Sequence, residues 1–152
     1  RLSSEAKSIL DSGCIYQCGR DKLYRPLVIV QLSKIEDLRE NKKFLIEALR
    51  HLLVMVREKM LLPYHVERWN LMIDTDDAGV IKSLEDFLDE MYQMIRDTFP
   101  MTLHKIYLMN VNIMRKIKED WNRKPVGLLS HLLSFQEAKR VSKDCHHQGK
   151  IR

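Results

Sequence analysis

The fold is decided by a short apolar stretch, Leu27-Val28-Ile29-Val30-Gln31-Leu32, which directly follows Pro26. Its β-branched residues and its continuous hydrophobicity are typical of a strand that is buried on both faces of a sheet. A long segment follows in which apolar residues recur in four-residue steps and therefore share one helical face. These residues are Phe44, Leu45, Ala48, Leu49, Leu52, Leu53 and Val56. The pattern predicts a strand over 27–32 and then a long helix that ends by Pro63.

The alternation of strand and helix continues along the chain. Residues 69–74 and 105–109 are predicted as strands, and a helix between them begins at Ser83 and stops at Phe99-Pro100. The apolar face of that helix consists of Leu84, Phe87, Leu88, Met91 and Ile95. On the other side of 27–32, the sequence predicts a short helix over 4–11, a short strand over 15–17 and a turn over 19–21. Such an order predicts an α/β fold, with a mixed or parallel sheet covered by helices.

Several helix starts carry capping signatures, among them Ser83 with Asp86 and the capping box Ser134-Phe135-Gln136-Glu137. The pattern Ser33-Lys34-Ile35-Glu36 is a capping box, which predicts that the long helix begins at Ser33. Farther along, Asn112 is expected to cap a helix that carries Ile117 and Trp121. Two shorter helical pieces are expected beyond Pro125.

The length of the chain fits one domain. It has 152 residues, of which 45% are hydrophobic and 31% are charged. We therefore expect a single domain over residues 1–152 with no linker. No apolar run approaches the roughly 20 residues that a helix needs to span a bilayer, and the N-terminus lacks the layout of a signal peptide. These observations predict a cytoplasmic protein.

Charge is spread unevenly along the chain. Between Arg115 and Arg152 there are 10 basic and 4 acidic residues, whereas the whole chain has 26 Lys and Arg against 21 Asp and Glu. The residues before Arg115 are therefore nearly neutral, with 16 basic against 17 acidic. A basic quarter on a neutral body indicates either an anionic partner, such as a phospholipid surface, or a solvated face.

Residues 74–85, Asp-Thr-Asp-Asp-Ala-Gly-Val-Ile-Lys-Ser-Leu-Glu, resemble a calcium loop of the EF-hand type. Acids occupy positions 1 and 3, Gly79 occupies position 6 and Glu85 position 12, as such a loop requires. Ala78 stands where a third oxygen ligand belongs, however, and Lys82 places a cation at position 9. The favoured interpretation is a strand end followed by a polar turn into a capped helix, with calcium binding as the alternative.

Apart from the acidic loop, the sequence contains no recognised catalytic or metal-binding motif. It has no nucleophile elbow, Walker A loop, dinucleotide-binding glycine motif or His-Glu-x-x-His pattern. Its six His residues are scattered without an evident acid or nucleophile partner. Cys14 and Cys18 lie four residues apart in an expected strand, which places them about 13 Å apart and too far for one zinc ion. We therefore expect no enzymatic activity, no metal and no cofactor other than a bound lipid.

The order of the elements resembles the CRAL-TRIO lipid-binding domain over residues 16–141. Residues 19–28, Gly-Arg-Asp-Lys-Leu-Tyr-Arg-Pro-Leu-Val, are similar to the family's turn and its Gly-Arg-Pro-Val lead into a buried strand, with Tyr24 in place of the glycine. Residues 69–74 resemble the family's strand that ends in aspartate. Phe99-Pro100 stands where a Tyr-Pro pair is usual, and residues 105–110 resemble the next strand with its terminal asparagine.

The resemblance diverges at the C-terminus. Residues 133–141, Leu-Ser-Phe-Gln-Glu-Ala-Lys-Arg-Val, can be aligned with the segment that opens the family's last strand. In the phosphatidylinositol-binding branch, a threonine and a lysine of that segment contact the headgroup phosphate, and here Glu137 and Arg140 take their places. The resemblance thus implies that Arg140, with Lys139 beside it, contacts a phosphate. Residues 142–152 are too polar for a buried strand and are expected to form a basic tail.

The resemblance also implies an apolar cavity between the sheet and the C-terminal helices. We expect Tyr107, Met109, Ile117 and Trp121 to line it, and the methionines of the second half suit an adaptable apolar site. The implied function is the binding or transfer of a phospholipid, such as phosphatidylinositol, or of another hydrophobic molecule at membrane surfaces. The protein is expected to act as a monomer with peripheral membrane association, and no covalent bond is made or broken.

Other classes of function stay open. The same fold could serve as a protein-interaction or regulatory module that holds no lipid, or the acidic loop could bind calcium. Nucleic acid is not an expected partner, because the basic stretch lacks interleaved aromatic residues beyond Trp121 and Phe135. A lipid that co-purifies with the protein would distinguish the lipid binder from the interaction module.

Overall fold

The computed structural model describes residues 1–75 and 81–109, except for the side chains of residues 81–85 and 108. The elements in this part follow the order α1 (Ser4–Asp11), β1 (Ile15–Arg20), β2 (Pro26–Gln31), a 3-10 turn η1 (Leu32–Lys34), α2 (Leu38–Lys59), β3 (Trp69–Asp74), α3 (Ile81–Thr98) and β4 (Leu103–Leu108). The helices predicted after residue 110 lie outside the described residues.

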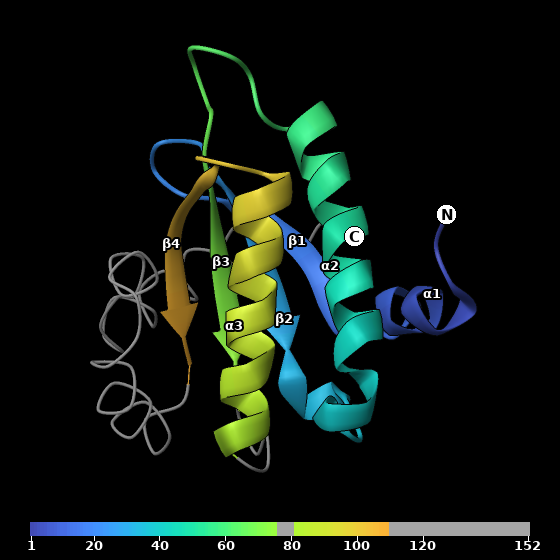
Figure 1. Cartoon of the computed structure of the whole chain (residues 1–152). Coiled ribbons are helices and arrows are strands. Elements are labelled where there is room, and N and C mark those ends of the chain that lie inside the picture. The colour runs from blue at the N-terminus through green and yellow to red at the C-terminus, as the bar shows by residue number, and fades with distance from the viewer. Residues whose placement is uncertain (76–80, 110–152) are drawn as a thin grey trace.

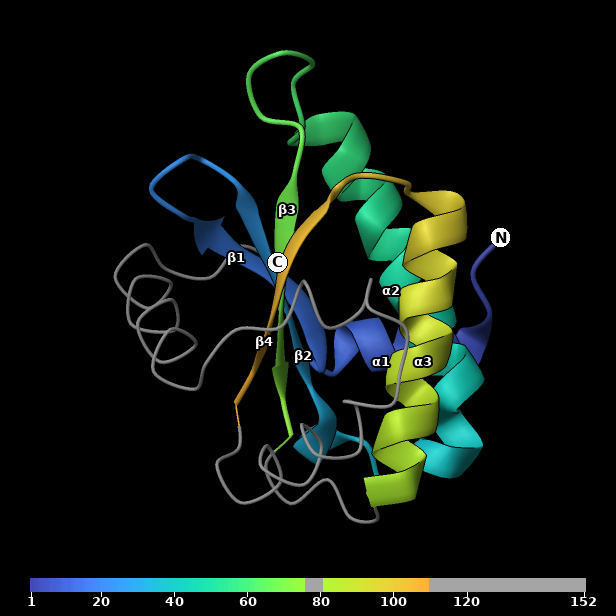
Figure 2. The same ribbon diagram turned by 60° about the vertical axis from the view of Figure 1, so that its left-hand side comes forward.

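The four strands form one mixed sheet in the order β1-β2-β3-β4 (Figure 1). Strand β1 is antiparallel to β2, whereas β2, β3 and β4 are parallel to one another. Parallel neighbours need crossover connections, which α2 and α3 provide. Both of these helices and α1 lie on the same side of the sheet (Figures 1 and 2). The predicted α/β fold with a mixed sheet and covering helices is therefore confirmed.

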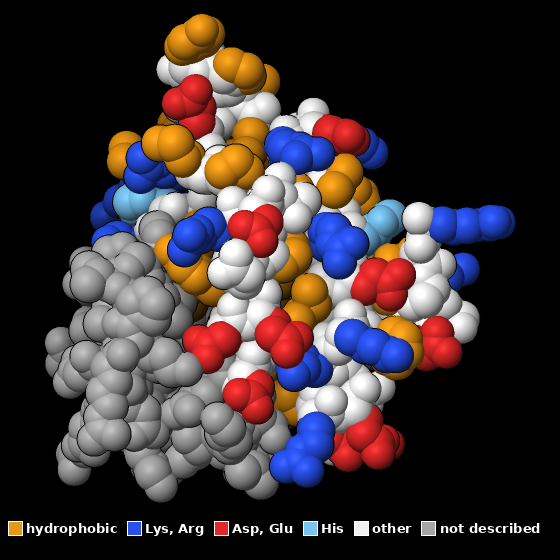
Figure 3. Space-filling view, in the orientation of Figure 1, with side chains coloured by type: hydrophobic (Ala, Val, Ile, Leu, Met, Phe, Trp, Pro, Cys, Tyr) orange, Lys and Arg blue, Asp and Glu red, His pale blue; other side chains and the backbone are white. Residues whose placement is uncertain are grey.

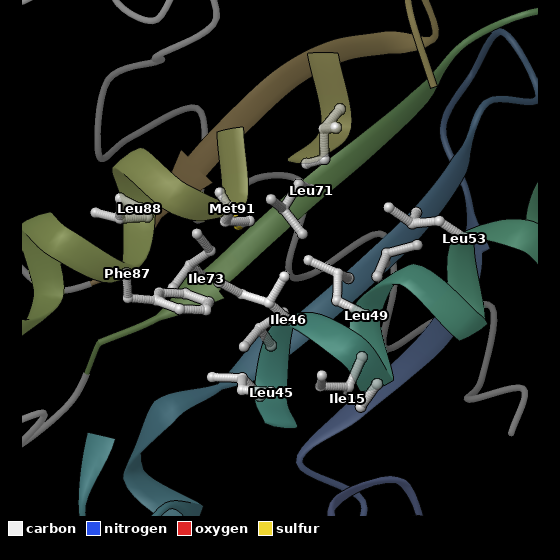
Figure 4. Close-up of a cluster of buried hydrophobic side chains, with 14 of the residues drawn as sticks. Ile15, Leu45, Ile46, Leu49, Leu53, Leu71, Ile73, Phe87, Leu88 and Met91 are labelled. Atoms are coloured by element: carbon white, nitrogen blue, oxygen red, sulfur yellow. The ribbon is translucent and has the colours of Figure 1, made fainter. Parts of the chain in front are cut away.

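The main hydrophobic core lies between this side of the sheet and the helices. Helix α2 buries Leu38, Leu45, Ile46, Ala48, Leu49, Leu53 and Val56. Helix α3 buries Phe87, Leu88, Met91 and Ile95, as its apolar spacing predicts. Figure 4 shows Phe87 pointing toward Ile73 of β3 and Ile46 of α2. Between the helices, Lys42 Nζ lies 2.7 Å from Glu90 Oε1.

Several element boundaries differ from the prediction. The capping box at Ser33 does not start α2, because residues 32–34 form the 3-10 turn instead. The helix begins after Asp37, whose carboxylate accepts hydrogen bonds from the backbone N–H groups of Arg39 and Glu40. An aspartate offers the same N-cap chemistry as a serine. Helix α3 and strand β4 each begin two residues earlier than predicted.

The connection from β1 to β2 also differs from the predicted turn over 19–21. Strand β1 continues to Arg20, with a change of register between Gln17 and Arg20 that is typical of a β-bulge. Gly19 in this bulge has a φ of 60°, a value that glycine adopts without strain. The chain then turns over residues 21–25, where Tyr24 N–H donates to the carbonyl of Asp21 (2.9 Å).

Tyr24 occupies a backbone conformation that suits glycine. Its φ is 64° and its side chain is exposed. Left-handed backbone costs a non-glycine residue roughly 1–2 kcal/mol, and an exposed ring recovers little of that energy through packing. The replacement of the family's glycine by Tyr24, noticed in the sequence, therefore corresponds to a strained position.

We expect Tyr24→Gly to raise the free energy of unfolding by about 0.5–1 kcal/mol, because the gain from relieved strain is partly offset by the greater freedom of an unfolded glycine. Thermal or urea unfolding measures this change. Leu23→Gly is the matched control, since Leu23 is equally exposed but has no positive φ, and it should destabilise the protein. A lower stability for Tyr24→Gly would contradict the assignment of strain to this residue.

Candidate functional site

The sheet has a second face, opposite the three helices, and its side chains form a separate apolar cluster. We call the face of the sheet that lies opposite the helices the second face. The cluster consists of Tyr16, Cys18, Leu27, Ile29, Met72 and Tyr107, with Met109 packed against it. Strand register explains the cluster, because alternate residues of a strand point to opposite faces. Ile29 pairs with Tyr16 on one side and with Met72 on the other, and Met72 pairs with Tyr107. Four side chains thus form one apolar row across the sheet.

A polar cluster lies at one end of this face. Asn70 lies two residues before Met72 on the same strand, and its register partners are Leu27 and Lys105. Asn70 Nδ2 donates to Asp21 Oδ2 (2.9 Å), and Arg25 Nε donates to the same oxygen (2.6 Å). The other carboxylate oxygen of Asp21 accepts from the backbone N–H groups of Leu23 (2.8 Å) and Arg25 (2.9 Å). Asp21 thus ties the β1–β2 turn to the start of β3.

Two pKa shifts report the electrostatics of this cluster. Burial by itself raises the pKa of Asp21, but the hydrogen bonds from Arg25, Asn70 and Leu23 outweigh it and leave this pKa below its usual value of 3.8. Burial lowers the pKa of His104 below 6.5, and the positive charges of Arg25 and Lys105 lower it further. Asp21 only partly opposes these charges at His104. The surroundings of His104 therefore favour its neutral form.

Asn70 has an acceptor that lacks a partner among the described residues. The residue is completely buried, and its Oδ1 accepts no hydrogen bond there. A buried acceptor without a partner costs roughly 1–3 kcal/mol, so native proteins nearly always satisfy such atoms with protein, water or ligand. Oδ1 therefore offers a hydrogen-bond acceptor beside an apolar surface. No periodicity in the sequence indicated this role, because Asn70 appeared only as one residue of a predicted strand.

The predicted site residues are only partly described. Tyr107 lies buried on the second face and Met109 packs against the same cluster, so the fold brings these two residues together, and their contact with a lipid stays a prediction. Ile117, Trp121, Lys139 and Arg140 lie outside the described residues. The expected cavity between the sheet and the C-terminal helices lies there too.

Two pockets lie elsewhere in the described part. One, of about 370 Å³, lies beside β1 and α2 and is lined by Leu10, Asp11, Gly13, Ile15, Tyr16, Gln17, His51, Leu52 and Met55. The other, of about 470 Å³, lies beside α1 and is lined by Ser4, Glu5, Ser8, Ile9, Ser12, Lys34, Ile35, Glu36 and Asn41. Neither contains Tyr107 or Met109, and Tyr16 is the one residue of the second-face cluster that lines either of them.

The described cysteines do not form a zinc site. Cys14 belongs to the core under the helices and Cys18 to the second face, so the two side chains lie on opposite sides of the sheet. Burial raises the pKa of the Cys14 thiol to about 11, which disfavours the thiolate that zinc requires. Within residues 1–75 and 81–109, no three His, Cys, Asp or Glu side chains are grouped to hold a metal ion. Residues 76–80 of the acidic loop and the side chains of residues 81–85 lie outside the described part, although β3 precedes the loop as the predicted strand.

Comparison with known proteins identifies the class. The family model of the CRAL/TRIO domain matches residues 10–117, so this chain belongs to the CRAL/TRIO domain family. Among solved structures, the chain is similar to the crystal structure of Sfh5, with a TM-score of 0.62 and 10% sequence identity. The similarity covers 88% of this chain and 49% of that one, so the chain spans about half the length of the Sfh5 chain. No curated protein matches the chain.

Proposed function

We propose that the protein binds one phospholipid or similar hydrophobic molecule against the second face of the sheet and exchanges it at membrane surfaces. No covalent bond is made or broken in this function. Acyl chains would be shielded from water on the apolar side chains, at roughly 0.8 kcal/mol for each buried CH₂ group. Membership of the CRAL/TRIO family and the apolar second face both support this proposal. Within residues 1–75 and 81–109, no helix is both long and apolar enough to cross a membrane.

The buried side-chain oxygen of Asn70, which has no hydrogen-bond partner among the described residues, supports the proposal most strongly. An apolar surface alone would suit core packing, but a completely buried amide oxygen without a partner needs a hydrogen-bond donor. A hydroxyl group of a lipid headgroup, as in phosphatidylinositol, supplies such a donor. Ligand sites typically combine an apolar lining with a few polar groups that fix orientation. In this proposal, the hydroxyl binds Asn70 while the acyl chains lie along the row that contains Met72 and Tyr107.

The phosphate would bind elsewhere in the same site. The family alignment implies Arg140 as its ligand, with Lys139 as its neighbour, while Ile117 and Trp121 extend the apolar lining. A guanidinium offers a planar fork of donors that matches a phosphate. The proposed domain covers residues 1–152, acts as a monomer and needs no metal or other cofactor. Phosphatidylinositol is the preferred ligand because its ring offers several hydroxyl groups to Asn70.

We expect Asn70→Ala and Arg140→Ala each to lower the affinity for phosphatidylinositol about tenfold, since each removes one polar contact. A vesicle-to-protein lipid transfer assay measures this affinity. Asn70→Ala removes an unpaired buried acceptor, which stabilises the fold, and a hydrogen bond to Asp21, which destabilises it. Because the two effects oppose each other, the free energy of unfolding of the lipid-free protein should change by less than about 1 kcal/mol.

Asn41→Ala is the matched control, because Asn41 lies on α2, away from the second face, and its amide contacts only the carbonyl of Asp37 among described partners. It should leave the affinity unchanged. An affinity within about twofold of the parent for both Asn70→Ala and Arg140→Ala would remove both residues from the site, together with the alignment of residues 133–141.

A further inference from the structure

We propose that three turns at one end of the sheet form a surface that inserts into the interfacial region of anionic membranes. This loop-end surface consists of five exposed side chains: Leu23 (64%), Tyr24 (69%), Leu62 (58%), Tyr64 (94%) and Met101 (86%). The inference goes beyond the proposed function, because it concerns the outside of the molecule and holds whether or not a lipid is kept inside.

The three turns lie side by side. They connect β1 to β2, α2 to β3 and α3 to β4, and they occupy the same end of the molecule in Figures 1 and 2. Arg20 links the first two, because its guanidinium donates to the carbonyls of Tyr24 (2.6 Å) and Met60 (3.4 Å). Trp69 links the second to the third, because its backbone N–H and its ring Nε1 donate to the carbonyl and the hydroxyl of Thr102, each at 2.9 Å. In Figure 3, hydrophobic side chains gather at this upper end.

Backbone strain is concentrated on the same residues. Three non-glycine residues of the described part have a positive φ: Tyr24 (64°), Tyr64 (67°) and Met101 (62°). All three carry large apolar or aromatic side chains and all three are among the most exposed. Glycine or asparagine would remove the strain at each position. A strained backbone that presents an exposed hydrophobic side chain indicates that the side chain has a use outside the folded chain.

The chemistry of the three turns favours a membrane over a protein. Tyrosine suits the interface between headgroups and acyl chains, because its ring is apolar and its hydroxyl is polar. Residues 20–25, 57–68 and 99–105 together contain seven Lys and Arg against three Asp and Glu, a net charge of +4. Lys22, Arg57, Lys59 and Arg68 are exposed in these segments, against exposed Glu58 and Glu67, so basic side chains outnumber acidic ones near the hydrophobic tips. Each of the five side chains is more than half exposed, so the tips project into solvent.

The position of this surface also suits ligand exchange. Tyr24 and Leu23 belong to the same turn as Asp21, which contacts Asn70 at the polar end of the second face. A protein seated on its loop-end surface would therefore bring that end of the second face close to the headgroups.

The test uses a variant that relieves strain and removes the apolar tips together: Tyr24→Gly, Tyr64→Gly and Met101→Gly. Binding is measured by co-sedimentation with vesicles of phosphatidylcholine and phosphatidylserine, and stability by thermal unfolding. We expect vesicle binding to fall at least about tenfold, while the melting temperature stays the same or rises. Added salt should weaken the binding of the parent. Met55→Ala is the control, because Met55 is an exposed apolar residue of α2 that lines the pocket beside β1 and is not one of the five tip residues, and it should bind vesicles as the parent does.

Vesicle binding of the triple variant within about twofold of the parent would overturn the proposal, as would no binding by the parent or an equal loss in Met55→Ala. A parent that self-associates in sedimentation, with the triple variant monomeric and still bound to vesicles, would assign the surface to a second copy of the chain and also overturn it. Native mass spectrometry separates this outcome from the proposed function. The triple variant should keep any lipid that co-purifies with the parent, and a parent without lipid would contradict the proposed function alone.

Discussion

Phe87→Ala should lower the free energy of unfolding by about 3–5 kcal/mol. Phe87 is completely buried and lies in the core between α3, β3 and α2. Removing its ring leaves a cavity that the two crossover helices and the sheet cannot close without moving, so both the transfer energy and the contact energy are lost. For a chain of this length, the melting temperature should fall by about 10 °C.

Arg96→Ala is the matched control for Phe87→Ala, because it changes an exposed residue on the same helix. Surface substitutions of this kind usually stay within about 0.5 kcal/mol. Urea unfolding followed by circular dichroism measures both variants. A loss below about 1 kcal/mol for Phe87→Ala would show that α3 does not pack on the sheet as described.

Asp21→Asn is expected to lower the free energy of unfolding at neutral pH by about 2–3 kcal/mol. The side chain is only 17% exposed and accepts four hydrogen bonds from Leu23, Arg25 and Asn70. An asparagine can replace one carboxylate oxygen but presents a second donor to Arg25 and Asn70, so the charge-assisted contacts are lost. Glu36→Gln controls for the loss of an acid, because Glu36 is exposed.

The effect of Asp21 on stability should depend on pH. Its pKa in the folded protein lies below the usual 3.8, so the folded state favours the ionised carboxylate. This contribution is therefore present above pH 3.8 and is lost as the pH falls through the folded pKa. The parent and Asp21→Asn should converge in stability in acid. A constant difference between them from pH 7 down to the acid range would contradict the role of the ionised carboxylate.

The order and type of the elements could be predicted from the sequence because their periodicities are strong. The run around Val28, the apolar face of α3 and the strand that begins at Trp69 each bury the residues that their spacing indicates. The start of α2 could not be predicted, because Ser33 and Asp37 both offer N-cap chemistry four residues apart. In the folded chain, Asp37 is the residue that caps α2. The bulge at Gly19 escaped prediction because a glycine there fits either a turn or a bulge.

The candidate site was less predictable than the fold. Tyr107 and Met109 could be placed on it from their strand and from the family resemblance. The polar end could not, since Asp21, Arg25 and Asn70 come from a turn and two strands that only the folded sheet brings together. The loop-end surface is a similar case. Its five residues are scattered between Leu23 and Met101 and follow no period, so only the three-dimensional structure shows that they share one end of the molecule.

Native mass spectrometry of the freshly purified protein tests the central claim, that a lipid binds against the second face, most directly. We expect a mass that exceeds that of the polypeptide by one phospholipid, and we expect the Asn70→Ala protein to carry less of it under the same conditions. Fragmentation of the released ligand would identify its headgroup. A mass equal to that of the polypeptide alone in every preparation, including after incubation with phosphatidylinositol vesicles, would contradict the claim and favour a protein-interaction module on the same fold.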